Sequence, residues 1–458
     1  SNALAHALAD RGIREGDGVA ILCRNHRGFI EATVACSKLG AHCLYLNTMF
    51  AGPQITDVCA REKPVAIIYD EEYAGLCADA LVERQGFVAW TDGDRTHEDP
   101  LLEELIAGGD TSNLVPPAEK GRIVILTSGT TGTPKGANRK QPESLDPAAA
   151  LFSRIPLRAL EATHIAAPMF HSWGLAHFLL AMSLGSTVVL RRRFDPEEML
   201  AVIERYRCTT LVVVPVMLQR ALELPEETLA KYRCPTLRVI ASSGSALPGE
   251  LALRAMDRFG EVVYNLYGST EVAWATIATP EDLRAAPGTA GKPPYGTVVR
   301  LYDEDGQPVG LGETGRIFVG NEMAFDGYTG GGTKDVIDGL MSTGDVGHFD
   351  ADGRLFVDGR DDEMIVSGGE NVFPREVEDL LADHPAVEEA AVVGVPDPEW
   401  GQRLKGFVVL REGEAADADA LKQHVKAHLA GYKVPREIDF LDELPRNATG
   451  KVLKRELG

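Results

Sequence analysis

The chain has 458 residues, which is enough for two or three folded domains with a substantial buried core. Its 46 lysines and arginines are outnumbered by 68 aspartates and glutamates, so the formal net charge is −22. A chain this acidic does not offer a general nucleic-acid surface, and anionic membranes repel it. An anionic ligand would therefore have to be held by local basic side chains and backbone amides.

The seven cysteines show no Cys-x-x-Cys spacing and lie in apolar surroundings. We therefore expect buried free thiols in a reducing compartment. We find no signal peptide and no run of about 18 apolar residues in the sequence. These observations favour a cytoplasmic protein without an integral membrane segment.

Helical and strand patterns alternate from the N-terminus as far as Glu281. Apolar runs predict strands at residues 18–22, 65–69, 123–126, 187–190, 211–214, 237–241 and 262–266. Helical periodicity lies between them, and one helix is expected to begin at Asp195, an N-cap followed by proline. Such alternation predicts an α/β fold with doubly wound parallel sheets. Three arginines at 191–193 close one strand and are expected to be a solvated strand end.

Beyond Glu281 the pattern changes. Short strands with Asp-Gly turns predict a small β-barrel or distorted sheet over residues 282–360. Residues 361–458 are predicted to form a compact α+β segment, with helices at 374–381 and 418–429 and strands at 390–395 and 407–410. We place a hinge between the two parts at Asp361 and Asp362.

The strand at residues 123–126 leads directly into a loop of Gly, Ser and Thr with one lysine. Its sequence is Thr127-Ser128-Gly129-Thr130-Thr131-Gly132-Thr133-Pro134-Lys135-Gly136. Such a loop can turn backbone N–H groups inward and add hydroxyl donors and a positive charge, as a polyphosphate requires. It is not the Walker loop, which needs Gly before its Lys and Ser or Thr after it. An ordinary surface linker would have a similar composition.

Further motifs carry side chains with binding or catalytic chemistry. They lie at residues 167–174, 242–246, 267–271, 342–345 and 444–451. Glu271 offers a hard oxygen ligand that suits Mg²⁺, and the Asp345 carboxylate can accept two hydrogen bonds. A histidine beside aromatic residues, as at His171, is more often packed than functional, and a lysine near the C-terminus, as at Lys451, is usually solvated.

Taken together and in order, these motifs resemble those of the adenylate-forming, AMP-binding superfamily, which includes acyl-CoA synthetases, luciferases and peptide-synthetase adenylation domains. The sequences of the motifs are similar to those of actinobacterial fatty-acyl-CoA synthetases of the long-chain-fatty-acid–CoA ligase type. The resemblance runs from Leu4 to the C-terminus. It implies an AMP-binding N-terminal domain over residues 1–360 and a mobile C-terminal domain over residues 361–458. Relatives have several tens of residues before the position of Leu4, so the N-terminus is expected to be shortened.

The resemblance implies roles for individual residues. ATP phosphates would be bound by Thr127, Ser128, Gly129, Thr130, Thr131, Gly132 and Lys135. Adenine and ribose would be bound by Ser243, Gly244, Ser245, Tyr267, Gly268, Asp345 and Arg360. The acyl pocket would contain His171, Trp173 and Gly268, the coenzyme A tunnel Gly368 and Gly369, and the hinge Asp362. Mg²⁺ would be held by Glu271 and Thr130, and the catalytic residues would be Lys451, Thr270, Glu271 and His171.

The implied reaction has two steps. A carboxylate attacks the α-phosphorus of ATP and expels pyrophosphate, with Mg²⁺ present, and coenzyme A then attacks the acyl-adenylate. Rotation of the small domain about the hinge would separate the steps. Amino-acid-activating relatives carry an aspartate where this chain has His171, so we expect an apolar, fatty acid substrate rather than an α-amino acid.

Three alternatives remain at this level. They are a ligase that loads the pantetheine of a carrier protein, a luciferase-like oxygenase, and a non-catalytic nucleotide-binding relative. The acyl chain length, the thiol acceptor and the oligomeric state, for which a homodimer is one candidate, are left open by the sequence. Residues 327–333 depart from the common pattern, which puts local contacts there in doubt.

Overall fold

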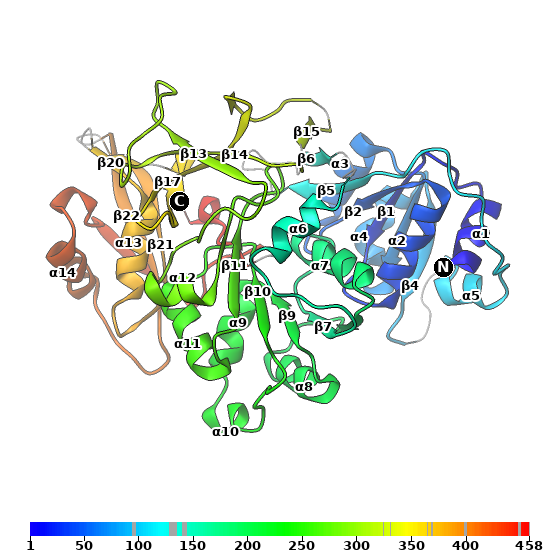
Figure 1. The fold of residues 1–458 in the computed structure, drawn as a ribbon, viewed down its shortest axis with the longest axis horizontal. Helices are drawn as coiled ribbons and strands as arrows, with labels where there is room; N and C mark the ends of the chain where they lie inside the picture. Colours follow the sequence, from blue (N-terminus) through cyan, green and yellow to red (C-terminus); the bar gives the residue numbers. More distant parts are fainter. Residues whose placement is uncertain are drawn as a thin grey trace.

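The structure, a computed structural model, describes residues 1–93, 98–127, 135–139, 144–323, 325–329, 331–363, 365–367, 370–397, 401–447 and 450–457. Within these residues, four β-sheets organise the chain (Figure 1). Three belong to a large N-terminal α/β domain, and the fourth lies in a smaller C-terminal domain, in agreement with the predicted fold class.

The first sheet contains seven strands and is mainly parallel. Its order is β15 (Phe325–Tyr328), β6 (Lys135–Arg139), β5 (Ile123–Thr127), β2 (His42–Tyr45), β1 (Gly18–Leu22), β3 (Ala66–Asp70) and β4 (Gln85–Trp90). Its helices are α1 (Asn2–Asp10), α2 (Arg27–Leu39), α3 (Gly52–Glu62), α4 (Ala74–Leu81) and α5 (Leu102–Ala107). Alternate residues of β1 belong to different core clusters: Val19 and Ile21 pack with α1, α2 and α5, and Ala20 and Leu22 with α3 and α4. The strand is therefore apolar on both faces, as expected for a covered parallel sheet.

The second sheet has six strands, five of them parallel. Its order is β12 (Thr276–Ala278), β11 (Val263–Tyr267), β10 (Val239–Ser242), β9 (Thr210–Val213), β7 (Ala162–Ile165) and β8 (Thr187–Leu190). Its helices are α6 (Asp146–Phe152), α7 (Ser172–Ser183), α8 (Pro196–Tyr206), α9 (Pro215–Leu222), α10 (Glu226–Leu229), α11 (Gly249–Phe259) and α12 (Pro280–Ala285). The predicted cap of α8 is confirmed, because the Asp195 carboxylate accepts a hydrogen bond from the Glu198 N–H at 2.8 Å.

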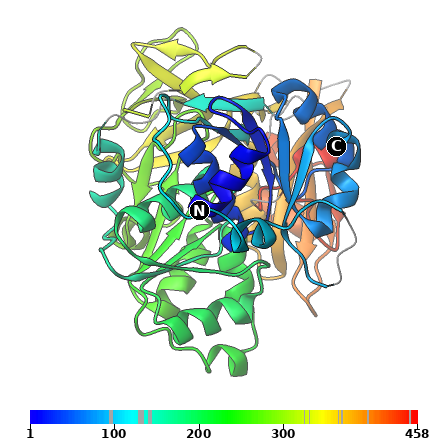
Figure 2. The same cartoon turned by 90° about the vertical axis from the view of Figure 1, so that its right-hand side faces the viewer.

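One hydrophobic core joins the two large sheets. Ile21 of β1, Phe29 of α2, Trp173 and Phe178 of α7, and Val212 of β9 all belong to it. Helix α7 therefore lies between the sheets, while α8, α9 and α11 cover the other face of the second sheet. Figure 2 shows the first sheet toward the viewer and the C-terminal domain, in orange, behind it.

The β-rich region expected after residue 281 forms a third sheet. It contains β13 (Val298–Tyr302), β14 (Gly315–Gly320), β17 (Leu340–Phe349), β16 (Val336–Ile337) and β18 (Leu355–Arg360). Strand β15 does not join it but pairs with β6 of the first sheet. The antiparallel pairing of β17 with β18 sets Asp345 directly opposite Arg360.

The C-terminal sheet contains β20 (Glu370–Val372), β19 (Ile365–Ser367), β22 (Gly401–Leu410), β21 (Val387–Asp397) and β23 (Glu437–Phe440). Helices α13 (Pro374–Ala382) and α14 (Ala418–His428) pack on it around Val377, Leu381 and Leu421. A short 3₁₀ helix, η2 (Asp361–Glu363), joins β18 to this sheet at the predicted hinge. The domain boundary itself stays a prediction.

The interpretation of residues 191–193 as a solvated strand end is wrong for Arg192. Its side chain is only 12% exposed, and it pairs with Glu72 at 3.0 Å, with Asp92, and with Asp70 at 3.8 Å. It also lies over the Trp90 ring at 5.3 Å. Arg192 thus connects the end of β8 to the first sheet through ion pairs between segments that are far apart in the sequence.

All seven cysteines are buried and free, as predicted. Among the helices that the structure describes, none combines the length and apolar character that crossing a bilayer requires.

Candidate functional site

Three of the predicted motifs lie at one edge of the second sheet. The parallel strands β9, β10 and β11 end at Val213, Ser242 and Tyr267, and the segment after β7 leads to His171. The carboxyl ends of parallel strands meet at one edge, which is where ligands bind in open α/β sheets. The motifs at residues 167–174, 242–246 and 267–271 follow these strand ends.

Asp345 is the centre of a hydrogen-bonded cluster beside this edge. The Tyr267 hydroxyl donates to Asp345 Oδ2 at 2.6 Å, and Arg360 Nη1 donates to Oδ1 at 3.4 Å. The Asp345 side chain is 13% exposed. A carboxylate has about four acceptor positions, so two stay available for a diol such as ribose.

The Asp345 carboxylate is buried in a positively charged environment. Burial raises the pKa of Asp345, and the charge of Arg360, the Tyr267 hydroxyl and the charges of Lys451 and Lys334 act in the opposite direction. Burial, followed by the negative charge of Asp345, raises the pKa of Tyr267 well above its usual value. Tyr267 therefore stays a neutral donor.

Glu271 lies in the hairpin that connects β11 to β12. The Tyr328 hydroxyl donates to Glu271 Oε1 at 2.7 Å, and the Glu271 N–H donates to Ser269 Oγ at 3.2 Å. Asn321 Nδ2 holds the same hairpin by donating to the carbonyls of Val272 and Trp274, at 2.8 and 2.9 Å. A half-buried carboxylate held in this way fits the hard oxygen ligand that Mg²⁺ prefers. Thr130, its predicted co-ligand, lies outside the described residues.

Gly268 is required by the tight return of this hairpin. A Cβ there would lie 2.3 Å from the Ala273 carbonyl oxygen and 2.6 Å from the Trp274 Cα. On the neighbouring strand end, the Ser243 hydroxyl donates to the Leu266 carbonyl at 2.8 Å, and Gly244 has a φ of +100°. Ser243 thus joins two loops of the predicted adenine site, while Ser245 beside it is half-buried.

His171 and Trp173 begin helix α7. Burial lowers the pKa of His171 to about 4, and its Nε2 is buried without a hydrogen-bond partner among the described residues. The ring is therefore neutral at pH 7 and holds no fixed charge. Trp173 is buried and donates its Nε1–H to the Val213 carbonyl at 3.1 Å, so it is fixed against the end of β9.

Lys451 comes from the C-terminal domain and lies on a tight turn. Asn447 organises the turn: its carbonyl accepts from the Gly450 N–H and its Oδ1 from the Lys451 N–H, both at 2.9 Å. A Cβ on Gly450, whose φ is +78°, would lie 2.5 Å from Val216 Cγ1. The turn therefore packs on the start of α9, and the Lys451 charge reaches Asp345.

Several predicted residues are only partly described. Thr127 and Lys135 lie on β5 and β6, and residues 128–134 lie outside the described residues. Gly368 and Gly369 lie outside them as well. Asp362 lies in η2, whose first residue, Asp361, accepts a hydrogen bond from Arg316 Nε at 3.1 Å. Thr270 is half-buried in the β11–β12 hairpin.

The sequence did not single out two residues that border this site. Tyr328 reaches Glu271 from β15, and Lys334 Nζ lies 3.3 Å from where a Cβ of Gly344 would be. Tyr328 lies within the stretch 327–333, where the sequence departs from the pattern of its relatives, and Lys334 directly follows it. That departure was the one signal that pointed to them.

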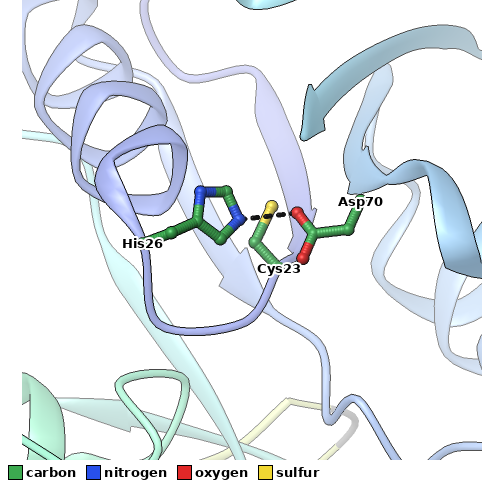
Figure 3. A group of neighbouring side chains, drawn as sticks. All are labelled: Cys23, His26 and Asp70. Carbon is green, nitrogen blue, oxygen red and sulfur yellow. Dashed lines mark hydrogen bonds and ion pairs between the residues drawn. The ribbon is translucent and has the colours of Figure 1, made fainter. Parts of the chain in front are cut away.

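A separate cluster of Cys23, His26 and Asp70 has ligand atoms within 4.8 Å of one another (Figure 3). His26 Nδ1 accepts from the Gly28 N–H at 3.0 Å, so its Nε2 carries the proton and donates to Asp70 Oδ1 at 2.7 Å. Burial, followed by the Asp70 charge, raises the pKa of Cys23 well above its usual value. The thiol is therefore protonated and the imidazole is fully engaged. This trio is a hydrogen-bonded cap for helix α2 rather than a metal centre.

Known proteins are similar to this chain over almost its whole length. The sequence profile of the AMP-binding enzyme family matches residues 1–329, and that of the AMP-binding enzyme C-terminal domain matches residues 376–451. A feruloyl-CoA synthase from Amycolatopsis sp is 36% identical over 459 residues, covering 99% of this chain and 91% of the relative. A long-chain-fatty-acid–CoA ligase from Mycobacterium tuberculosis is 30% identical, covering 100% and 91%.

A solved structure extends the comparison to a bound intermediate. The o-succinylbenzoate CoA synthetase of Bacillus subtilis, in complex with its acyl-adenylate, superimposes with a TM-score of 0.85 at 29% identity, covering 100% of this chain and 91% of that one. Fold and site thus define a nucleotide-dependent adenylating protein with a two-domain architecture. The chain belongs to the AMP-binding enzyme family.

Proposed function

We propose that this protein is an ATP-dependent acid–CoA ligase that activates a carboxylic acid as its acyl-adenylate and transfers the acyl group to coenzyme A. The observation that carries the proposal is the approach of Lys451, from the C-terminal domain, to the Tyr267–Asp345–Arg360 cluster of the N-terminal domain. A nucleotide bound by its ribose at Asp345 would have its α-phosphate within the field of Lys451. The relatives support the same chemistry by their names.

In the first step this chain supplies binding and charge. Asp345 accepts hydrogen bonds from the ribose, and Tyr267 and Arg360 hold the carboxylate in place. Lys451 stabilises the negative charge that spreads over the acid carboxylate and the α-phosphate as pyrophosphate leaves. Mg²⁺, when bound at Glu271, would neutralise phosphate charge. Lys135 and the loop that precedes it are proposed to bind the remaining phosphates.

In the second step coenzyme A attacks the acyl-adenylate and AMP leaves. The turn that carries Lys451 packs just beyond the end of β9, at Val216, so a thiol that enters from this side needs the turn to withdraw. Rotation of the C-terminal domain about η2 would withdraw it and bring the Gly368–Gly369 loop toward the site.

The site favours an acid with an apolar body. His171 is neutral because burial lowers its pKa to about 4, and Trp173 presents a buried apolar ring beside it. Neither side chain offers the fixed negative charge that an α-ammonium group needs. We therefore propose an aryl or fatty acid as substrate, which is the range that the names of the relatives span.

Pyrophosphate release over a panel of carboxylic and amino acids, with and without coenzyme A, tests the proposal. We expect release with ATP and an aryl or fatty acid, and a thioester only when coenzyme A is present. Robust activation of an α-amino acid, or release without a thioester when coenzyme A is supplied, would contradict it. The latter result would favour a carrier-protein ligase.

A further inference from the structure

Ion pairs anchor the chain on both sides of the predicted hinge at Asp362. The residue before it, Asp361, accepts a hydrogen bond from Arg316 Nε of β14 at 3.1 Å, which connects it to the N-terminal domain. The residue after it, Glu363, pairs with Nζ of Lys454 in the C-terminal domain at 3.2 Å. A rotation about Asp362 would leave both ion pairs intact, and the pair of Glu363 with Lys454 would move with the C-terminal domain.

Lys454 also contacts a second carboxylate. It begins the 3₁₀ helix η4 (Lys454–Glu456), and its Nζ lies 2.8 Å from Oε1 of Glu378 on helix α13. The same Glu378 oxygen accepts a hydrogen bond from the Val392 N–H of β21 at 2.7 Å. The Lys454 and Glu378 side chains are only 22% and 17% exposed, and a partly buried ion pair is screened much less than an exposed one. Lys454 thus connects the hinge to α13 and β21.

Backbone hydrogen bonds connect Lys454 to the turn that carries Lys451, three residues earlier. The Leu453 N–H donates to the Pro445 carbonyl at 2.7 Å, and the Asn447 N–H donates to the Lys451 carbonyl at 2.9 Å. These bonds hold the segment that ends in Lys454 against the segment that leads into the turn. A displacement of Lys454 is therefore passed on to Lys451.

We propose that Lys454 is a positioning residue for adenylation: by pairing with Glu363 it fixes the Lys451 turn relative to the hinge, so that domain rotation returns the Lys451 charge to the same place beside Asp345. The inference rests on the proposed function, because it assumes that Lys451 stabilises the charge that develops as the acyl-adenylate forms. Lys454 acts through Lys451 and not on the nucleotide, since its own Nζ is engaged by Glu363 and Glu378.

Glu363→Gln is the mildest test, because it removes one charge and leaves Lys454 paired with Glu378. With ATP and either octanoate or cinnamate, we expect the kcat of pyrophosphate release to fall about tenfold and the KM for ATP to stay unchanged. Lys454→Gln should lose roughly 10–100-fold, since a misplacement of about 1 Å can cost about 10²-fold. Lys454→Arg keeps the charge and should restore most of the rate. The matched control is Lys433→Gln, which removes the ion pair of Lys433 with Glu376 of α13, 2.7 Å apart and 21% and 31% exposed, and should leave pyrophosphate release unchanged.

Two further measurements separate positioning from a general loss of structure. Supplied with synthetic acyl-adenylate and coenzyme A, Glu363→Gln should form thioester at close to the wild-type rate. In a Lys451→Ala background, adding Lys454→Gln should slow pyrophosphate release no further, because the group that Lys454 positions is already absent.

Three outcomes overturn the positioning role while leaving the proposed function intact. They are an equal loss of both half-reactions in Glu363→Gln, a further fall in the double variant, and a wild-type rate of pyrophosphate release in Lys454→Gln. Absence of pyrophosphate release with every acid in wild type contradicts the proposed function itself, and with it the role of Lys454.

Discussion

Asp345 stands out among the predicted site residues because several donors and positive charges surround it. The carboxylate is buried, yet it accepts from Tyr267 and Arg360, and the charges of Lys451 and Lys334 also reach it. Such a group is stable only as an acceptor for several donors, since an unpaired buried charge is very costly. The order of motifs alone pointed to Asp345, but its partners become visible only when β17 and β18 pair.

Asp345→Ala should weaken ATP binding more than it weakens the fold. Hydrogen bonds to a charged group contribute about 1.5–3 kcal/mol each, so loss of the ribose contacts should raise the KM for ATP on the order of 10–100-fold. Steady-state kinetics with saturating acid measures this. Asp305→Ala, an exposed carboxylate in the turn between β13 and β14, is the matched control and should leave the KM for ATP unchanged. An unchanged KM in Asp345→Ala would place the ribose elsewhere.

Tyr328 holds Glu271, and we expect it to act through that residue. Tyr328→Phe removes only the hydroxyl that donates to Glu271 Oε1, so the carboxylate should lose its orientation but keep its charge. Adenylation should fall about tenfold or less and need more Mg²⁺ for half-maximal rate. Glu271→Gln removes the charge itself and should reduce adenylation further at every Mg²⁺ concentration. Measuring the adenylation rate against Mg²⁺ concentration for both variants, together with the affinity for ATP, distinguishes the two effects. If the rate depends on Mg²⁺ in the same way in Tyr328→Phe and in wild type, Tyr328 is only structural.

His177 makes stability depend on pH. Burial lowers the pKa of His177 to about 4 from a usual value of 6.5. At pH values between these two, the unfolded chain therefore binds a proton more readily than the native state does. The stabilisation is fully present above about pH 6.5 and is lost as the pH falls. Between pH 7 and pH 5.5 the loss should be about 1 kcal/mol. Thermal melting at a series of pH values should show a weaker pH dependence for His177→Gln than for wild type; an unchanged pH dependence would contradict the role of His177.

At the scale of elements, local signals predicted the strands that are apolar on both faces and the capped helices. Strands β1 and β8 match the predicted residues, and α8 begins where Asp195 caps it. Strands β2, β4 and β7 were not predicted from the sequence. Of the other missed strands, β6 and β15 are polar or glycine-rich, and their residues show no apolar alternation. They are strands because β6 pairs with β5 on one side and with the distant β15 on the other, a long-range contact that no local pattern contains.

The same limit applies to the site. Tyr267, Glu271 and Asp345 were predicted from motifs, but Tyr328 and Lys334 were not, because their roles depend on where β15 and the following loop lie in space. The burial of Arg192 could not be predicted from the local sequence either, because its acidic partners Glu72 and Asp92 precede it by 120 and 100 residues. Ion pairs of this kind are properties of the packed molecule.

The 3₁₀ helix η2 gives the hinge a testable conformation. Residues of a 3₁₀ helix have a moderately negative φ, which overlaps the narrow range to which the proline ring locks this angle. Asp362→Pro should therefore retain the present arrangement, in which Lys451 lies toward Asp345, and block rotation to the other. Pyrophosphate release should persist while thioester formation falls by at least tenfold. If both half-reactions keep their wild-type rates, η2 is not the hinge.

At the scale of the whole molecule, the function depends on two domains that meet beyond the end of β9. The N-terminal domain provides Asp345 and Glu271, and the C-terminal domain provides Lys451 on a turn that packs against Val216. Neither domain alone contains the complete site. The sequence predicted both domains and the need for a hinge, but not which arrangement the chain adopts. We propose that the arrangement in which Gly450 lies against Val216 is the adenylating one.

The most direct test of this account is to measure the two half-reactions separately in Lys451→Ala. Loss of one charge-stabilising donor should slow acid-dependent pyrophosphate release on the order of 10²–10³-fold. Supplied with synthetic acyl-adenylate and coenzyme A, the same variant should form thioester at close to the wild-type rate, because Lys451 is then withdrawn. Equal loss of both half-reactions, or undiminished pyrophosphate release, would contradict the assignment of Lys451 to adenylation and the movement of the C-terminal domain between the two steps.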